Sequence, residues 1–190
     1  MAVTVSMTAA NWITVARLGL VPVFVVALIE CLQSGAPFYR WLSLGVLAAA
    51  GLGDIIDGYV ARRFHQETSL GALLDPLADK LLLVLALVML SLHDGAQVDR
   101  VPLWLTATVL CRDVMLLMLV FVVGLRRGYG TPRPRTTGRV AAILQWLCVF
   151  GALLHIGPAW LMVLASAATG CTAVAGALYL RDGLNMLKER

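Results

Sequence analysis

Long runs of apolar residues, separated by short polar breaks, dominate the pattern along this chain. A helix that spans a bilayer needs about 20 consecutive, mostly apolar residues. Six runs approach this length, at residues 12–32, 40–62, 71–92, 101–124, 138–156 and 158–180. The breaks carry glycine, proline or charge, which is typical of turns, and no change in composition divides the chain. The pattern therefore predicts an all-α, polytopic integral membrane protein: one domain, residues 1–190, with six transmembrane helices.

The composition and charge agree with this prediction. Hydrophobic residues make up 60% of the chain and charged residues only 14%, whereas soluble domains are about half apolar and about one quarter charged. The formal net charge is +4. Because loops on the cytoplasmic side of a membrane are enriched in Lys and Arg, this excess is explained without nucleic acid. We therefore expect the lipid bilayer as a partner and no nucleic-acid partner.

Basic residues are distributed unevenly between the two sets of loop ends. Only Arg40 and Arg100 lie at one set. Ten lie at the other: Arg62, Arg63, Arg126, Arg127, Arg133, Arg135, Arg139, Arg181, Lys188 and Arg190. Because Lys and Arg accumulate on the cytoplasmic side, both termini are predicted to be cytoplasmic. No organelle-targeting segment is evident, and residues 1–11 lack the basic segment of a cleaved signal peptide. We therefore expect a bacterial plasma membrane and a first run that is retained.

Four aspartates interrupt the apolar pattern at two neighbouring places. Asp54 and Asp57 lie near the predicted cytoplasmic end of the second run, and Asp75 and Asp79 lie near the start of the third. A carboxylate in or beside hydrocarbon is costly unless it is paired or binds a metal. Carboxylate oxygens suit Mg²⁺, Mn²⁺ or Ca²⁺ better than zinc. Two divalent ions would neutralise the four charges, and two-metal sites recur in displacements at phosphorus.

The spacing of the aspartates places them on helix faces. Residues three and four apart are neighbours on a helix, so Asp54, Asp57, Gly58 and Ala61 share one face. Gly58 and Ala61 leave that face low, which would let a bulky ligand approach the backbone. The aspartate segment (residues 54–79) is therefore predicted to form a cation site that faces the cytoplasm.

The aspartate segment resembles the signature of the CDP-alcohol phosphotransferases, Asp-x₂-Asp-Gly-x₂-Ala-Arg-x₈-Gly-x₃-Asp-x₃-Asp. All eight specified positions match, from Asp54 to Asp79. The run Asn11-Trp-Ile-Thr14-Val-Ala-Arg17 resembles the pattern that begins the first span in this family, so the resemblance covers nearly the whole chain. It implies an enzyme that moves a substituted phosphate from a CDP-linked donor to an alcohol and releases CMP.

The resemblance also implies roles for individual residues. Asp54, Asp57 and Asp75 would hold two Mg²⁺ or Mn²⁺ ions, with Asp79 close by, and Asp79 would be the general base for the acceptor hydroxyl. The CDP donor would be bound by Asp54, Asp57, Gly58, Ala61, Arg62 and Gly71. The reaction is expected to be a direct in-line displacement, without a covalent enzyme intermediate.

Other short runs resemble two branches of the family that make phospholipids. Three runs resemble stretches of phosphatidylglycerophosphate synthases and CDP-alcohol-type cardiolipin synthases: Leu74–Lys80, Cys111-Arg112-Asp113 and Gly138–Gln145. In the last run, Arg139 and Ala142 replace a Lys and a Thr that are common there. An acceptor phosphate needs cationic partners, and the candidates are Lys80, Arg112, Arg139 and Arg17. For Arg112, an ion pair with a nearby carboxylate is an equal alternative.

These features give a first hypothesis and two alternatives. The first is a synthase that transfers the phosphatidyl group of CDP-diacylglycerol to glycerol 3-phosphate, giving phosphatidylglycerophosphate and CMP. The second uses phosphatidylglycerol as the acceptor and makes cardiolipin, which the run Thr131–Arg135 favours. The third is a divalent-cation transporter, which would explain the aspartates but not the pattern of Gly58, Ala61, Arg62 and Gly71.

Small residues and single polar residues complete the expectations. The small residues from Ala165 to Ala177 allow close helix packing, first within the bundle and also between two copies, so a homodimer is included among the expectations. The four cysteines and three histidines stand singly in the sequence. They are expected to be packing or surface residues rather than metal ligands.

Overall fold

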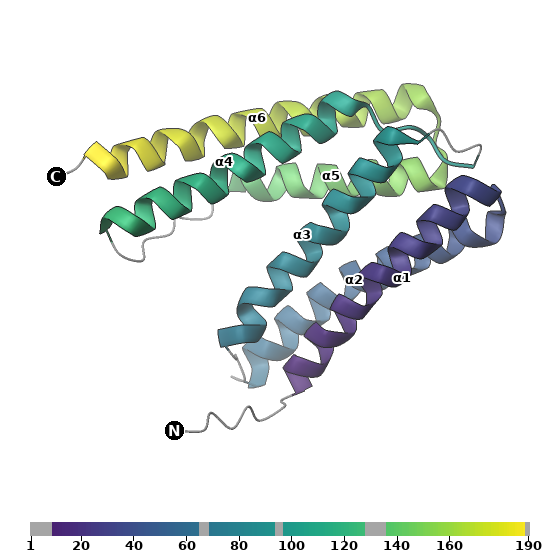
Figure 1. The fold of residues 1–190 in the computed structure, drawn as a ribbon, viewed down its shortest axis with the longest axis horizontal. Coiled ribbons are helices and arrows are strands. Elements are labelled where there is room, and N and C mark those ends of the chain that lie inside the picture. Colours follow the sequence, from purple (N-terminus) through teal and green to yellow (C-terminus); the bar gives the residue numbers. More distant parts are fainter. Residues whose placement is uncertain (1–8, 65–68, 94–96, 128–135, 189–190) are drawn as a thin grey trace. The chain divides into compact units, whose positions relative to one another are not determined.

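The computed structural model describes residues 9–64, 69–93, 97–127 and 136–188 (Figure 1). Within these ranges, the side chains of residues 9–18, 54–79, 120, 123–127 and 184–188 lie outside the description. The described residues form six α-helices: α1 Ala9–Ser34, α2 Pro37–Phe64, α3 Ser69–Leu92, α4 Leu103–Arg127, α5 Thr136–Leu154 and α6 Pro158–Lys188. Each predicted apolar run lies in one of these helices, apart from a residue or two at the ends of two runs, so the all-α prediction is confirmed.

Two helices in the described part of the chain are long and apolar enough to cross a membrane. They are α5, over Thr136–Leu154, and α6, over Pro158–Gly183. Gly19–Ser34 and Lys80–Leu92 are shorter apolar helical stretches. The crossing of the bilayer by all six helices, and the cytoplasmic position of both termini, stay predictions.

The chain divides into two compact units, each described by itself. The first contains residues 1–89 and 95–98, and the second contains residues 90–94 and 99–190. In the first unit α1 packs against α2, and Phe24, Leu28 and Leu47 are fully buried. In the second unit α6 packs against both α4 and α5 (Figure 1).

The connection between α1 and α2 is short because glycine and proline meet there. Gly35 has φ of 64°, a left-handed conformation that glycine adopts at the ends of helices without steric cost. Its N–H donates to the carbonyl of Cys31 over 3.2 Å. Pro37 then begins α2, where its missing N–H is no loss and its fixed φ suits the helix.

The turn between α5 and α6 is held by an acidic residue from another loop. His155 and Gly157 both have positive φ, 57° and 98°. The N–H of Gly157 donates to Asp99 Oδ2 over 2.7 Å, and His155 Nδ1 lies 3.0 Å from Asp99 Oδ1. The N–H of Asp99 donates to the carbonyl of Ala152 over 2.9 Å. The short turn at Gly157 and Pro158 therefore joins α5 and α6 as a tight antiparallel hairpin, and His155, which stands singly in the sequence, has a partner here.

Small residues and one polar pair bring α5 and α6 together. Ala165, Ala168, Thr172 and Ala175 are buried along α6, and small side chains of this kind allow helices in membranes to approach closely. The side chain of Gln145 is 2% exposed, and its Nε2 donates to Thr172 Oγ1 over 2.9 Å. The packing predicted for the small residues within the bundle is thus present, whereas the homodimer stays a prediction.

Candidate functional site

Outside residues 65–68, the backbone of the aspartate segment is helical, as the spacing of the aspartates predicted. Helix α2 continues without a break through Asp54, Asp57 and Arg62, and α3 contains Asp75 and Asp79. Only residues 65–68 separate the two helices, and a chain spans at most about 3.6 Å per residue. The short connection therefore limits how far the end of α2 can lie from the start of α3.

The side chains of the predicted metal and CDP-donor residues lie outside the described residues. This applies to Asp54, Asp57, Gly58, Ala61, Arg62, Gly71, Asp75 and Asp79, and also to Arg17. Among the side chains that the structure describes, no group of three or more His, Cys, Asp or Glu is arranged to hold a metal ion. The four carboxylates of the aspartate segment remain the residues whose chemistry fits hard divalent ions.

Three of the four predicted acceptor cations have described side chains. Lys80 on α3 and Arg139 on α5 are exposed. Arg112 on α4 differs from both, because its side chain is only 13% exposed. A guanidinium with so little access to water needs partners within the protein, so Arg112 is the cation whose surroundings carry most information.

Arg112 forms the ion pair that the sequence analysis held as an alternative. Its Nη1 lies 3.2 Å from Asp113 Oδ1, and the Asp113 side chain is 10% exposed. Arg112 Nε is buried and has no hydrogen-bond partner among the described residues. Within the guanidinium, Nη1 is therefore paired with Asp113, whereas Nε is a donor without a partner among the described residues.

Glycines from two other helices surround the Arg112 side chain. A Cβ added at Gly176 on α6 would lie 3.6 Å from Arg112 Cγ, so the aliphatic stem lies directly against α6. A Cβ added at Gly138 on α5 would lie 2.7 Å from Tyr179 Oη and 3.5 Å from Arg112 Nη2. The cluster of Arg112, Asp113, Gly138, Gly176 and Tyr179, called here the arginine cluster, therefore joins α4, α5 and α6.

The sequence singles out three members of this cluster, Arg112, Asp113 and Gly138, but not their surroundings. All three stand in runs that resemble members of the family, but nothing in the spacing of Tyr179 marks it in the sequence. Tyr179 is 9% exposed. The three-residue spacing between Gly176 and Tyr179, which places both on one helix face, is the signal that could have found them.

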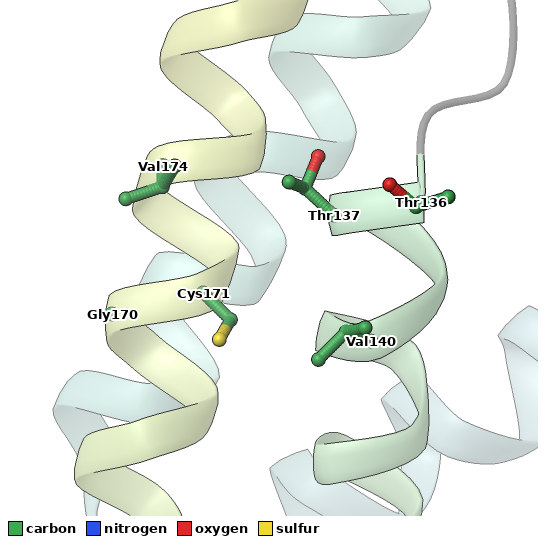
Figure 2. Close-up of a pocket in the computed structure, with 6 residues that line it drawn as sticks. All are labelled: Thr136, Thr137, Val140, Gly170, Cys171 and Val174. Carbon is green, nitrogen blue, oxygen red and sulfur yellow. The ribbon is translucent and has the colours of Figure 1, made fainter.

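A groove lies between the first turns of α5 and the middle of α6 (Figure 2). It has a volume of about 270 Å³ and is lined mostly by apolar atoms of Thr136, Thr137, Val140, Gly170, Cys171 and Val174. Figure 2 shows Cys171 and Val140 pointing into the space between the two helices. The lining suits a hydrocarbon chain and supplies no acid–base group.

Comparison with known proteins assigns the family. The sequence profile of the CDP-alcohol phosphatidyltransferase family matches residues 7–174, which include the aspartate segment, Arg112 and Arg139. The chain belongs to this family. It is therefore a transferase of phospholipid synthesis, as the resemblance of the aspartate segment implied, and Tyr179 lies beyond the matched residues.

Relatives in the family carry two different names. The chain is 36% identical to a cardiolipin synthase (CMP-forming) of Streptomyces coelicolor over 84% of this chain and 71% of that protein. It is 39% identical to the human cardiolipin synthase (CMP-forming) over 70% of this chain but only 39% of that protein. It is 30% identical to the CDP-diacylglycerol–glycerol-3-phosphate 3-phosphatidyltransferase of Bacillus subtilis over 76% of each chain.

Proposed function

We propose that this family member transfers the phosphatidyl group of CDP-diacylglycerol to the free glycerol hydroxyl of phosphatidylglycerol, forming cardiolipin and CMP. The observation that carries this proposal is the 36% identity to a cardiolipin synthase over 84% of the chain. Cardiolipin synthesis was the second hypothesis from the sequence. It becomes the first because the longest of the matches described above is to a protein named cardiolipin synthase.

The charge of the arginine cluster supports the same acceptor. Asp113 pairs with Arg112 at 3.2 Å, so the two side chains together contribute little net charge. The phosphodiester of phosphatidylglycerol carries one negative charge, whereas glycerol 3-phosphate is a dianion that needs more cationic compensation. A neutralised arginine fits the monoanion better.

Glycerol 3-phosphate is the second candidate acceptor. The 30% identity to the Bacillus subtilis phosphatidyltransferase covers 76% of both chains, and Lys80 and Arg139 are exposed cations, as a dianionic acceptor would require. With this acceptor the product would be phosphatidylglycerophosphate. Both reactions use the same donor and the same chemistry at phosphorus.

The proposed mechanism is one displacement. The Asp79 carboxylate takes the proton of the acceptor hydroxyl, whose oxygen forms a bond to the phosphorus of the phosphatidyl group. The bond from that phosphorus to the oxygen of CMP breaks, and CMP leaves with the electron pair. Gly58, Ala61, Arg62 and Gly71 bind the CDP group. Asp54, Asp57 and Asp75 would hold two Mg²⁺ or Mn²⁺ ions, which supply neutralisation of the charge that develops on the diphosphate.

The proposal includes the setting of the enzyme. Six membrane crossings with both termini in the cytoplasm would place the aspartate segment at the cytoplasmic face of a bacterial plasma membrane. The acyl chains of both lipid substrates would remain in the bilayer. A homodimer belongs to the proposal and is supported by the small residues of α6 alone.

A two-acceptor assay tests the proposed function. Purified protein in mixed micelles receives CDP-diacylglycerol and Mg²⁺ or Mn²⁺, with labelled phosphatidylglycerol or labelled glycerol 3-phosphate. We expect cardiolipin and an equal amount of CMP from phosphatidylglycerol, and at most slow conversion of glycerol 3-phosphate. Asp79→Asn should abolish both products, whereas Glu30→Gln, an acid on α1 outside the site, should not. Faster use of glycerol 3-phosphate would favour the second candidate.

A protein that releases no CMP with either acceptor would contradict both candidates. The transporter alternative has its own readout, which is metal uptake into sealed vesicles that contain no nucleotide. We expect no such uptake above that of vesicles without protein.

A further inference from the structure

We propose that Tyr179 is a positioning residue that holds the guanidinium of Arg112 in the orientation required by the acceptor's phosphate. The inference rests on the proposed function in one respect, which is the role of Arg112 as a phosphate-binding residue. The reasons for assigning a role to Tyr179 come from the packing of the arginine cluster.

The ion pair with Asp113 cannot orient Arg112 by itself. Arg112 and Asp113 are adjacent on α4, and neighbouring residues on a helix point in different directions rather than toward each other. A pair of this kind fixes one nitrogen, here Nη1 at 3.2 Å from Asp113 Oδ1, and leaves the plane of the guanidinium free to turn. The remaining constraint has to come from other helices.

Helix α6 supplies that constraint at two points on one face. At Gly176 the absent side chain lets the Arg112 stem lie against the helix, with Cγ 3.6 Å from the position of a Cβ. One turn later, Tyr179 extends its hydroxyl toward the start of α5. There Tyr179 Oη and Arg112 Nη2 border the same space, 2.7 Å and 3.5 Å from the position that a Cβ at residue 138 would occupy.

The orientation that results leaves one edge of the guanidinium for a ligand. Nη1 is used by Asp113, whereas the buried Nε has no hydrogen-bond partner among the described residues. Thr137 Oγ1, one residue before Gly138, is likewise buried without a partner in the described part of the chain. A buried donor without a partner is costly. The Nε and Nη2 edge of an arginine binds two phosphate oxygens at once, so a phosphate group would satisfy the unused donor.

Tyr179→Phe tests the inference in the acceptor assay. Loss of the hydroxyl should raise KM for the phosphate-bearing acceptor about tenfold, the size expected for one weakened hydrogen bond to a charged group. KM for CDP-diacylglycerol and kcat at saturating acceptor should stay within about twofold of the wild-type values, because the reacting groups are untouched. Tyr39→Phe, which removes a phenol hydroxyl at the start of α2, is the matched control and should change none of these constants.

Gly138→Ala tests the same geometry without removing any polar group. The added methyl would meet Tyr179 Oη at 2.7 Å and must displace it, so KM for the acceptor should rise as in Tyr179→Phe. In the double variant the nearest remaining contacts are at 3.4 Å and 3.5 Å, so the second change should add little to the first. Gly45→Ala, at a helical glycine with open space around it, is the control.

A binding measurement separates this inference from the proposed function. Inorganic phosphate should raise the melting temperature of the wild-type protein in detergent and should do so less in Tyr179→Phe and Gly138→Ala, with no turnover required. If CMP release fails but this difference is found, the proposed function falls and the positioning role stands. Equal phosphate effects in all variants, additive effects of the two changes, or an equal rise in KM for the donor would overturn the inference.

Discussion

At the scale of single residues, buried polar side chains such as Asp99 stabilise the position of other groups by hydrogen bonds. Asp99 is 6% exposed, and its two oxygens and its N–H hold the turn between α5 and α6 from a loop more than fifty residues earlier in the chain. The N–H of Gly157 would lose its partner if Asp99 were removed. Buried donors of this kind are paired in most proteins because the unpaired state is costly.

Replacement of Asp99 by alanine should therefore destabilise the protein. We expect a loss of about 1–3 kcal/mol in the free energy of unfolding, the usual cost of leaving a buried donor unsatisfied. Reversible unfolding in detergent, followed by circular dichroism, measures the loss. Asp99→Asn retains an acceptor oxygen for Gly157 and should recover part of it. An Asp99→Ala protein with wild-type stability would show that the turn does not depend on this residue.

Residues whose role follows from a sequence motif could be predicted. Residues whose role depends on packing between helices could not. Asp54, Asp57, Asp75 and Asp79 stand out because charge is rare in apolar runs. Tyr179 does not, since its proposed role depends on Arg112 and Gly138 from two other helices. No pattern along one chain segment contains that information.

At the scale of helices, the apolar runs predicted the number and order of the elements in the described residues. The ends of the helices were predicted less well: α6 continues to Lys188 and α2 begins at Pro37, whereas the apolar runs end at 180 and begin at 40. The physical reason is that the thickness of the hydrocarbon layer determines the length of an apolar run. A helix, in contrast, continues until it reaches a residue that ends it. Gly35 and Gly157 mark such points.

The hydrogen bond between α5 and α6 gives a prediction at this scale. Gln145 Nε2 donates to Thr172 Oγ1 over 2.9 Å, and Thr172 Oγ1 donates to the carbonyl of Ala168 over 2.6 Å. A double-mutant cycle with Gln145→Leu and Thr172→Val should give a coupling of about 0.6 kcal/mol and at most about 1.7 kcal/mol, the range for such bonds between membrane helices. The free energies come from unfolding in detergent. A coupling of zero would mean that the small residues of α6 hold the two helices without this bond.

At the scale of the whole molecule, the proposed function draws on both compact units. The aspartate segment lies in the first unit, and the arginine cluster lies in the second. The family assignment rests on residues 7–174 and therefore includes most of both. Under the proposed function, the aspartate segment would hold the metal ions and the CDP donor, and Arg112 would bind the phosphate of the acceptor.

The central claim is that the four aspartates hold divalent ions, and that these ions bind the diphosphate of a CDP-linked lipid. Binding of Mn²⁺, followed by electron paramagnetic resonance, tests this most directly in the wild-type protein and in Asp54→Asn and Asp75→Asn, with Glu30→Gln as a control. We predict two Mn²⁺ ions per wild-type chain in the presence of CDP-diacylglycerol. We also predict loss of at least one ion and of CMP release in both aspartate variants, with the control unchanged. Wild-type Mn²⁺ binding and wild-type CMP release in the aspartate variants would contradict the claim.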